Sequence, residues 1–260
     1  MTANIRFVRS LPSLQQIEEK CGKNYTIYEL AKNFVPEGWE SFFKEVDEEL
    51  YNISQIIEEE IQKGYRIVPE KHHILRVFYE MDPYDSKVCI IGMDPYPQLL
   101  PNGKPRAQGL SFSVCKEDVI PASLMNIFKE ILQSHPETPP ERIPKNGDLQ
   151  NWVNQGVMLL NVCLTCRLNE SNSHAKYKLW HPFLNKYLKF MAGINKDLIF
   201  VMWGNDAQKM EAMISRNFKN MLMAPHPSGL SAYRGFIGCG HFTKINEMLV
   251  SQKKTPIIWI

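Results

Sequence analysis

Apolar residues recur every three or four positions in the first third of the chain. This spacing places them on one face of a helix, and it predicts one long amphipathic helix from Trp39 to Ile61. The other face of this helix carries the acidic runs 45–49 and 58–60, which we expect to be solvated. No segment of the chain repeats, and none is of low complexity.

Further along the chain, continuous apolar runs alternate with amphipathic segments. The apolar runs predict strands at 87–91, 157–164, 197–203 and 220–224. The amphipathic segments predict helices at 123–134, 147–155, 179–191, 207–216 and 240–251, with Ser123 as N-cap of the first. Strands that are apolar throughout and separated by helices indicate a parallel sheet covered on both faces. We therefore predict an α/β fold, a single-domain three-layer α/β/α sandwich around a central, mainly parallel four-stranded sheet.

Length and composition favour one domain. The chain has 260 residues, of which 44% are hydrophobic, enough for a substantial core. The Pro-rich stretches 98–105 and 136–144 interrupt the pattern without a change of composition, so we interpret them as surface loops. We expect residues 1–35 to be an N-terminal extension of unknown role and residues 36–260 to form the domain.

The charge balance excludes a bulk polycation. There are 30 basic and 28 acidic side chains, for a formal net charge of +2. Any contact with nucleic acid must therefore come from a few placed residues and from backbone amides. The sequence has no apolar run of 18 residues, so we expect no membrane-spanning helix and an intracellular protein, cytoplasmic or nuclear.

The six cysteines are too sparse for a disulfide scaffold. Cys163 and Cys166 form a Cys-x-x-Cys pair, but a zinc site would need two more ligands at short spacing, and none is nearby. We interpret the pair as two small residues on and after a strand, and we expect no metal.

Polar residues follow the predicted strands where each one ends. Asp94 comes after the first strand, on a turn stiffened by two prolines, Asn161 interrupts the second strand, and His226 follows the last. Carboxyl ends of parallel strands meet at one edge, where ligands bind, so we expect these side chains to line one cleft. Each also has a plain structural interpretation: Asp94 as a turn former, and His226 as a donor to a carbonyl. The Asn161 amide needs a partner, backbone or ligand, because an unpaired buried amide costs about 1–3 kcal/mol.

Six motifs, spread in order between residue 38 and the end of the chain, resemble those of family 1 uracil-DNA glycosylases. They are Gly-Met-Asp-Pro-Tyr-Pro at 92–97, Gly-Leu-Ser-Phe-Ser-Val at 109–114, Ile-Pro-Ala-Ser-Leu-Met-Asn at 120–126, Gly-Val-Met-Leu-Leu-Asn at 156–161, Val-Met-Trp-Gly at 201–204 and His-Pro-Ser-Gly-Leu-Ser at 226–231. The chain departs from the family pattern at Met93, where Gln is usual, and at Pro97, where His is usual and poxvirus-like members also have Pro. A few extra residues follow Tyr96, and Gly229 replaces a proline.

The resemblance implies a monofunctional glycosylase that flips uracil out of DNA and hydrolyses its N-glycosidic bond, leaving an abasic site. It implies that Asp94 positions the attacking water and that His226 donates to uracil O2. Phe112 would stack on the base, and Asn161 would read its edge. Tyr96 would exclude the methyl group of thymine.

The remaining implied residues complete the uracil pocket and contact DNA. Met93 would line the pocket. Leu230 would fill the space that the flipped uracil leaves in the base stack. The residues implied to contact the DNA strand are Ser123, Ser228, Ser231, Tyr233 and Arg234. The resemblance implies a monomer that acts on uracil in single- or double-stranded DNA and needs no cofactor or metal. It also implies that a protein inhibitor that mimics DNA is a possible partner.

An alternative stays open at this stage. Met93 and Pro97 alter the loop around Asp94, so the chain could be a DNA-binding replication accessory protein on the same scaffold, with weak or no catalysis. A small-molecule α/β hydrolase is less well supported, because the Gly-x-Ser-x-Gly elbow is absent.

Overall fold

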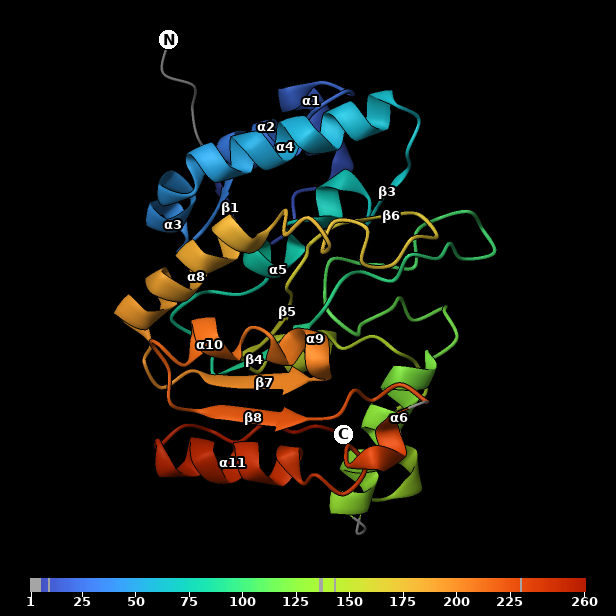
Figure 1. The fold of residues 1–260 in the computed structure, drawn as a ribbon, viewed down its shortest axis with the longest axis vertical. Coiled ribbons are helices and arrows are strands. Elements are labelled where there is room, and N and C mark those ends of the chain that lie inside the picture. Colours follow the sequence, from blue (N-terminus) through green and yellow to red (C-terminus); the bar gives the residue numbers. More distant parts are fainter. Residues whose placement is uncertain (1–5, 9, 136–137, 143, 230) are drawn as a thin grey trace. The chain divides into compact units, whose positions relative to one another are not determined.

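The computed structural model describes residues 6–8, 10–135, 138–142, 144–229 and 231–260 (Figure 1). The chain forms two compact units, each assembled from separate stretches of sequence. The first comprises Met1–Asp85, Met93–Leu110 and Asn161–Asn195, and the second comprises Ser86–Gly92, Ser111–Leu160 and Lys196–Ile260. The chain passes from the second unit to the first between Gly92 and Met93 and again between Leu160 and Asn161.

The central sheet has four parallel strands, and the prediction of an α/β fold around such a sheet is confirmed. The strands lie in the order β5 (Val157–Asn161), β4 (Val88–Gly92), β7 (Ile199–Trp203) and β8 (Met221–Ala224). In the register, Val88 faces Ile199, and Phe200 faces Met221. Every residue of β4, β5 and β7 is buried, which explains why these strands are apolar throughout. The second predicted strand is shorter than expected, since it ends at Asn161.

Five helices of the second unit lie in connections between these strands: α6 (Ala122–Ser134), η2 (Pro140–Arg142), α7 (Gln150–Val153), α9 (Asn205–Gln208) and α10 (Glu211–Ile214). Two more, η3 (Ala232–Arg234) and α11 (His241–Ser251), follow β8. The prediction of one helix at 207–216 is wrong, because α9 and α10 are separate turns. Ser123 as N-cap is also wrong: extended Pro121 precedes the first helical residue, so Ser123 lies inside the first turn of α6.

The first unit is mainly helical. Its helices are α1 (Leu14–Cys21), α2 (Ile27–Asn33), α3 (Glu40–Glu45), α4 (Asp47–Gln62), η1 (Lys71–His73), α5 (Arg76–Tyr79) and α8 (His181–Ile194). Two small sheets accompany them, β1 (Arg6–Val8) with β2 (Phe34–Pro36), and β3 (Ile67–Val68) with β6 (Cys166–Arg167). An aromatic cluster forms the core; its rings include Trp39, Phe42, Phe78, Phe183 and Tyr187.

The predicted long helix is interrupted at Val46, which ends α3 and precedes α4. Three acidic residues occupy the first turn of α4, where negative charge favours a helix N-terminus. The acidic runs are not merely solvated, because long basic side chains reach them. Lys186 pairs with Glu49 at 2.7 Å, and Lys71 pairs with Glu58 at 2.6 Å.

Helices α1 and α2 were missed by the periodicity. Both begin with a capping box, Ser13 with Gln16 and Thr26 with Glu29, which is a sequence signal for a helix start. The boundary expected at residue 36 stays a prediction, although it falls inside β2.

Candidate active site

The segments that follow β4 and β5 lie side by side in the first unit. The amide of Cys163 donates to the carbonyl of Met93 at 2.9 Å. Two residues of this region, Asp94 and Asn161, are the carboxylate and the amide predicted to be functional. The structure therefore brings together the chain segments that carry them.

The Asp94 carboxylate is held by a loop that lies 77 residues further along the chain. The amide of Asn172 donates to its Oδ2 atom at 2.5 Å. The hydroxyl of Ser171 donates to the same oxygen at 3.1 Å and lies 3.4 Å from Oδ1. Hydrogen bonds of this kind favour the ionised carboxylate and restrict its orientation.

That loop is itself anchored to α4 through a partly buried ion pair. Arg167 donates to Glu60 through Nη2 at 2.7 Å and through Nε at 3.0 Å. His174 Nε2 lies 2.9 Å from the same carboxylate, and because a carboxylate only accepts, Nε2 carries the hydrogen. The bidentate arginine lowers the pKa of Glu60, with a further contribution from His174.

Polar partners surround this ion pair on its buried side. The Thr165 hydroxyl lies 2.8 Å from His174 Nδ1 and accepts the Trp180 indole N–H at 2.8 Å. The Ser173 hydroxyl accepts the Arg167 amide at 2.8 Å. These bonds connect the loop to the helical core of the first unit.

Asn161 is the last residue of β5, and its side chain is 7% exposed. Within the described ranges, its side-chain amide makes no hydrogen bond to the protein. Buried amides are normally paired, so this one is suited to a ligand that offers both a donor and an acceptor. Of the two partners that the sequence left open, backbone or ligand, the structure supplies no backbone partner among the described residues.

Tyr96 and Pro97 continue the loop after Asp94 and are half-buried. The carbonyl of Pro97 accepts the Asn169 amide at 2.7 Å, and the carbonyl of Pro95 accepts the Cys166 thiol at 3.4 Å. The turn is therefore fixed by hydrogen bonds as well as by its prolines.

Phe112 and His226 lie together in the second unit. Their ring centroids are 6.1 Å apart, and the Trp203 ring packs edge-on against Phe112 at 5.5 Å. Phe112 has φ of 62°, which is an outlier for a bulky residue. Such strain persists only where the surrounding structure imposes it, and it clusters at functional sites.

The imidazole of His226 is neutral and oriented. Its Nδ1 atom accepts the Ser228 amide at 3.0 Å, so the ring hydrogen is on Nε2 and is able to donate. Burial lowers the pKa of His226, although Asp206 opposes this. Gly204 makes room for the ring, since a Cβ there would approach the His226 Cβ to 2.7 Å.

The serines predicted to hold phosphates stabilise their own loop in this structure. The Ser231 hydroxyl donates to the His226 carbonyl at 2.7 Å, and the Ser228 hydroxyl lies 2.9 Å from that of Ser231. Since Ser231 uses its hydrogen on the carbonyl, Ser228 is the donor between them. Asn126 on α6 also supports the loop, through a bond to the Pro227 carbonyl at 2.8 Å.

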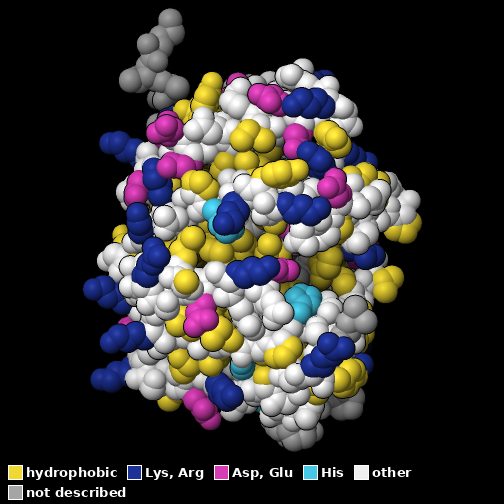
Figure 2. All heavy atoms as spheres, viewed as in Figure 1, with side chains coloured by type: hydrophobic (Ala, Val, Ile, Leu, Met, Phe, Trp, Pro, Cys, Tyr) yellow, Lys and Arg dark blue, Asp and Glu magenta, His cyan; other side chains and the backbone are white. Residues whose placement is uncertain are grey.

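The other predicted DNA contacts lie at exposed or half-buried positions. Ser123 is half-buried on α6, and Tyr233 and Arg234 are exposed on η3, with Tyr233 73% exposed. Leu230 lies outside the described residues. On the face shown in Figure 2, basic and acidic side chains are both present.

The Cys163–Cys166 pair consists of buried thiols. Burial raises the pKa of Cys163 to about 12 and raises that of Cys166 as well. Both thiols donate to backbone carbonyls, those of Thr165 and Pro95. Across the described ranges, no group of three or more His, Cys, Asp or Glu side chains is arranged to hold a metal, and no helix there is long and apolar enough to cross a membrane.

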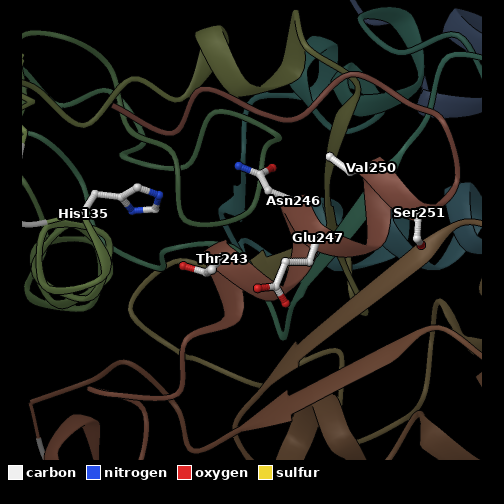
Figure 3. A pocket seen from close by; sticks show the side chains of 6 residues that line it. All are labelled: His135, Thr243, Asn246, Glu247, Val250 and Ser251. Atoms are coloured by element: carbon white, nitrogen blue, oxygen red, sulfur yellow. The ribbon is translucent and has the colours of Figure 1, made fainter.

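A hollow of about 470 Å³ lies elsewhere in the second unit, along α11 (Figure 3). Five of its lining residues belong to that helix, and His135 faces them. The Asn246 amide in this hollow is already bonded to the backbone of Ile257. None of the predicted site residues lines it.

The sequence missed the residues that support the site. They are Glu60, Arg167, Ser171, Asn172 and His174, to which the sequence analysis assigned no role. The available signal was weak, an acidic run on a helix and a polar loop, because their partners are distant in sequence.

Comparison with known proteins places the chain in a family. The model of the Uracil DNA glycosylase superfamily matches residues 78–250. A uracil-DNA glycosylase from Vibrio cholerae is 42% identical over 205 residues, 79% of this chain and 87% of that protein. One from Clostridioides difficile is 40% identical over 223 residues, 85% of this chain and 95% of that protein.

Solved structures agree. The crystal structure of mimivirus uracil-DNA glycosylase matches with a TM-score of 0.82 and 30% identity, covering 99% of this chain and 95% of that one. A mimivirus variant crystallised in complex with UGI matches with a TM-score of 0.78 and 31% identity, over 86% of this chain and 88% of that one. The chain belongs to the uracil DNA glycosylase superfamily.

Proposed function

We propose that this protein is a monofunctional uracil-DNA glycosylase of family 1. It removes uracil from DNA, hydrolyses the N-glycosidic bond and leaves an abasic site for base excision repair. The observation that carries the proposal is the Asn161 amide, nearly buried at the end of β5 and without a side-chain partner in the described part of the chain. Relatives of the same superfamily are uracil-DNA glycosylases at about 40% identity.

Asn161 accounts for the choice of base. Uracil presents an acceptor at O4 and a donor at N3, which match an amide's N–H and carbonyl. Cytosine presents the reverse pair, so a fixed amide rejects it. Tyr96 lies against C5 and excludes the methyl group of thymine, and Met93 lines the same pocket.

Phe112 and His226 act on the uracil ring. The strained Phe112 ring is the stacking platform for the flipped base, worth about 1–3 kcal/mol. His226 donates from Nε2 to uracil O2, where negative charge grows as the bond breaks. A neutral imidazole serves this purpose, in agreement with the hydrogen bond that its Nδ1 accepts.

Asp94 acts on the sugar and the water. When the bond from C1′ to N1 breaks, its electron pair leaves with uracil and C1′ becomes oxocarbenium-like. The carboxylate stabilises this cation and orients the water whose oxygen adds to C1′. That water gives up one proton, which balances the negative charge that leaves with uracil. Pro97, found also in poxvirus-like members of the family, replaces the usual His and so has no titratable side chain. Its carbonyl accepts a hydrogen bond from the Asn169 amide.

Contacts with the DNA strand come from neutral groups. Ser123, Ser228 and Ser231 and nearby amides hold phosphates, with Tyr233 and Arg234 beside them. Ser228 and Ser231 must exchange their mutual hydrogen bonds for phosphate contacts when DNA binds. Leu230 fills the gap left by uracil. By analogy with the mimivirus complex, we propose that an inhibitor of the UGI type binds here.

Uracil release from single- and double-stranded oligonucleotides tests the proposal, with the Asp94→Asn variant as the comparison. We expect wild type to leave alkali-labile sites and Asp94→Asn to bind DNA without releasing uracil. If both proteins bind DNA and neither releases uracil at enzyme excess, the chain is the accessory protein of the alternative interpretation.

A further inference from the structure

We propose that Ser171 is a positioning residue for uracil release, because it and the Asn172 amide hold the Asp94 carboxylate in its working orientation. This inference rests on the proposed function and adds a residue that determines the rate of uracil release. We call Ser171 and Asn172 the carboxylate clamp.

The geometry of the clamp restricts Asp94 in two ways. Both donors reach the same oxygen, Oδ2, from adjacent residues of one loop. The second contact of the Ser171 hydroxyl, 3.4 Å from Oδ1, opposes rotation of the carboxylate about its bond to Cβ. A carboxylate that orients water must keep such a geometry within hydrogen-bond reach of its target.

Asn172 adopts an unfavourable conformation to make this contact. Its φ is 60°, in the left-handed region that Asn tolerates better than most residues. Its side-chain Oδ1 is buried and, among the described residues, has no hydrogen-bond partner. Unpaired buried oxygens and left-handed backbone are both costly, and they persist at sites where function requires them.

The residues that follow the clamp in sequence hold it in place. The next two residues, Ser173 and His174, are buried and bonded to Arg167 and Glu60 respectively. Glu60 belongs to α4, a helix of 16 residues. The loop therefore presents its two donors from a rigid support, which is the arrangement that a positioned catalytic group needs.

Ser171 itself contributes little to folding. Its side chain is exposed, and substitutions at exposed positions change stability only slightly. Its hydroxyl nonetheless bonds a charged acceptor, and charge-assisted hydrogen bonds are about twice as strong as neutral ones. A Ser171→Ala substitution therefore separates an effect on the reaction from an effect on the fold.

The experiment measures kcat and KM for uracil release from a uracil-containing single strand, over pH 4–8, on the full chain. The variants are Ser171→Ala and Ser171→Thr, with Ser215→Ala as the matched control at an exposed serine outside the site. Ser171→Ala should lower kcat about 10-fold, since one charge-assisted bond to the carboxylate is lost. Its KM should stay within about twofold, and its Tm should shift by no more than about 2 °C.

Two further readouts separate positioning from a structural role. Because the lost bond favours the ionised carboxylate, the acidic limb of the kcat profile should move to higher pH in Ser171→Ala. Threonine keeps the hydroxyl, so Ser171→Thr should recover most of kcat. Ser215→Ala should match wild type in all respects.

A second pair of variants tests the backbone donor. Asn172→Val should lose more activity than Asn172→Gly, although glycine removes more atoms, because a β-branched residue disfavours positive φ and glycine accepts it. Equal losses would contradict a role for the Asn172 amide.

The outcomes are distinguishable from failure of the proposed function. If wild type releases no uracil, the proposed function is wrong. If wild type is active and Ser171→Ala has the same kcat and pH profile as Ser215→Ala, the proposed function stands and the clamp is refuted.

Discussion

Glu60 connects α4 to the loop that holds Asp94, and its replacement by Gln is expected to destabilise the protein strongly. The carboxylate accepts bonds from Arg167 Nη2 and Nε and from His174 Nε2, and its side chain is only 12% exposed. Glutamine has nearly the same shape but offers one acceptor oxygen and places an NH₂ group against another donor. Removing one partner of a buried ion pair costs about 3–5 kcal/mol. We expect the lower end, about 3 kcal/mol, because this pair is partly buried and because a Gln oxygen in the place of Oε2 keeps the bonds from Arg167 Nε and His174 Nε2.

The stability lost in Glu60→Gln should decrease as the pH falls. The pKa of Glu60 is lowered in the folded protein, chiefly by its bonds to Arg167. The stability that Glu60 contributes is therefore complete above the unfolded pKa of about 4.3 and is lost as pH falls through the lower folded value. The difference between wild type and Glu60→Gln should be full at pH 7 and should shrink below about pH 4.

Urea unfolding followed by circular dichroism measures both effects. The matched control is Glu59→Gln, the neighbouring residue, whose side chain is 66% exposed and whose ion pair with Lys63 spans 3.7 Å. Exposed pairs contribute about 0–1 kcal/mol, so this variant should unfold almost as wild type does. If Glu60→Gln unfolds at pH 7 as Glu59→Gln does, the proposed support of the loop is refuted.

Three more predictions concern other parts of the chain. Gly109→Ala should destabilise the protein by about 3 kcal/mol in urea unfolding, because the new Cβ would lie 1.9 Å from the His73 carbonyl oxygen at φ of 78°; unchanged stability would contradict the structure there. Phe112→Ala should lower kcat/KM about 10- to 100-fold, through lost stacking, and normal activity would exclude Phe112 as the platform. Burial lowers the pKa of His226, so any acidic limb that this residue causes in a kcat/KM profile from pH 4 to 8 should lie below pH 6.5. A limb at or above pH 6.5 would contradict this effect of burial.

Local patterns in the sequence were enough to predict the sheet. The four apolar runs correspond to β4, β5, β7 and β8, because a strand buried on both faces must be apolar throughout. The positions of Asp94, Asn161 and His226 at strand ends follow from the same pattern. The starts of α1 and α2 were present too, as the capping boxes at Ser13 and Thr26, although periodicity alone did not reveal them.

Only the tertiary structure identified what holds the site in place. Ser171 reaches Asp94 across 77 positions of sequence, and Arg167 reaches Glu60 across 107. The sequence names the polar groups but not their partners, since a hydrogen bond depends on where the folded backbone places both ends. Hydrophobic periodicity acts over a few residues and can be read along the chain, whereas the orientation of a carboxylate is decided by segments that meet only after folding.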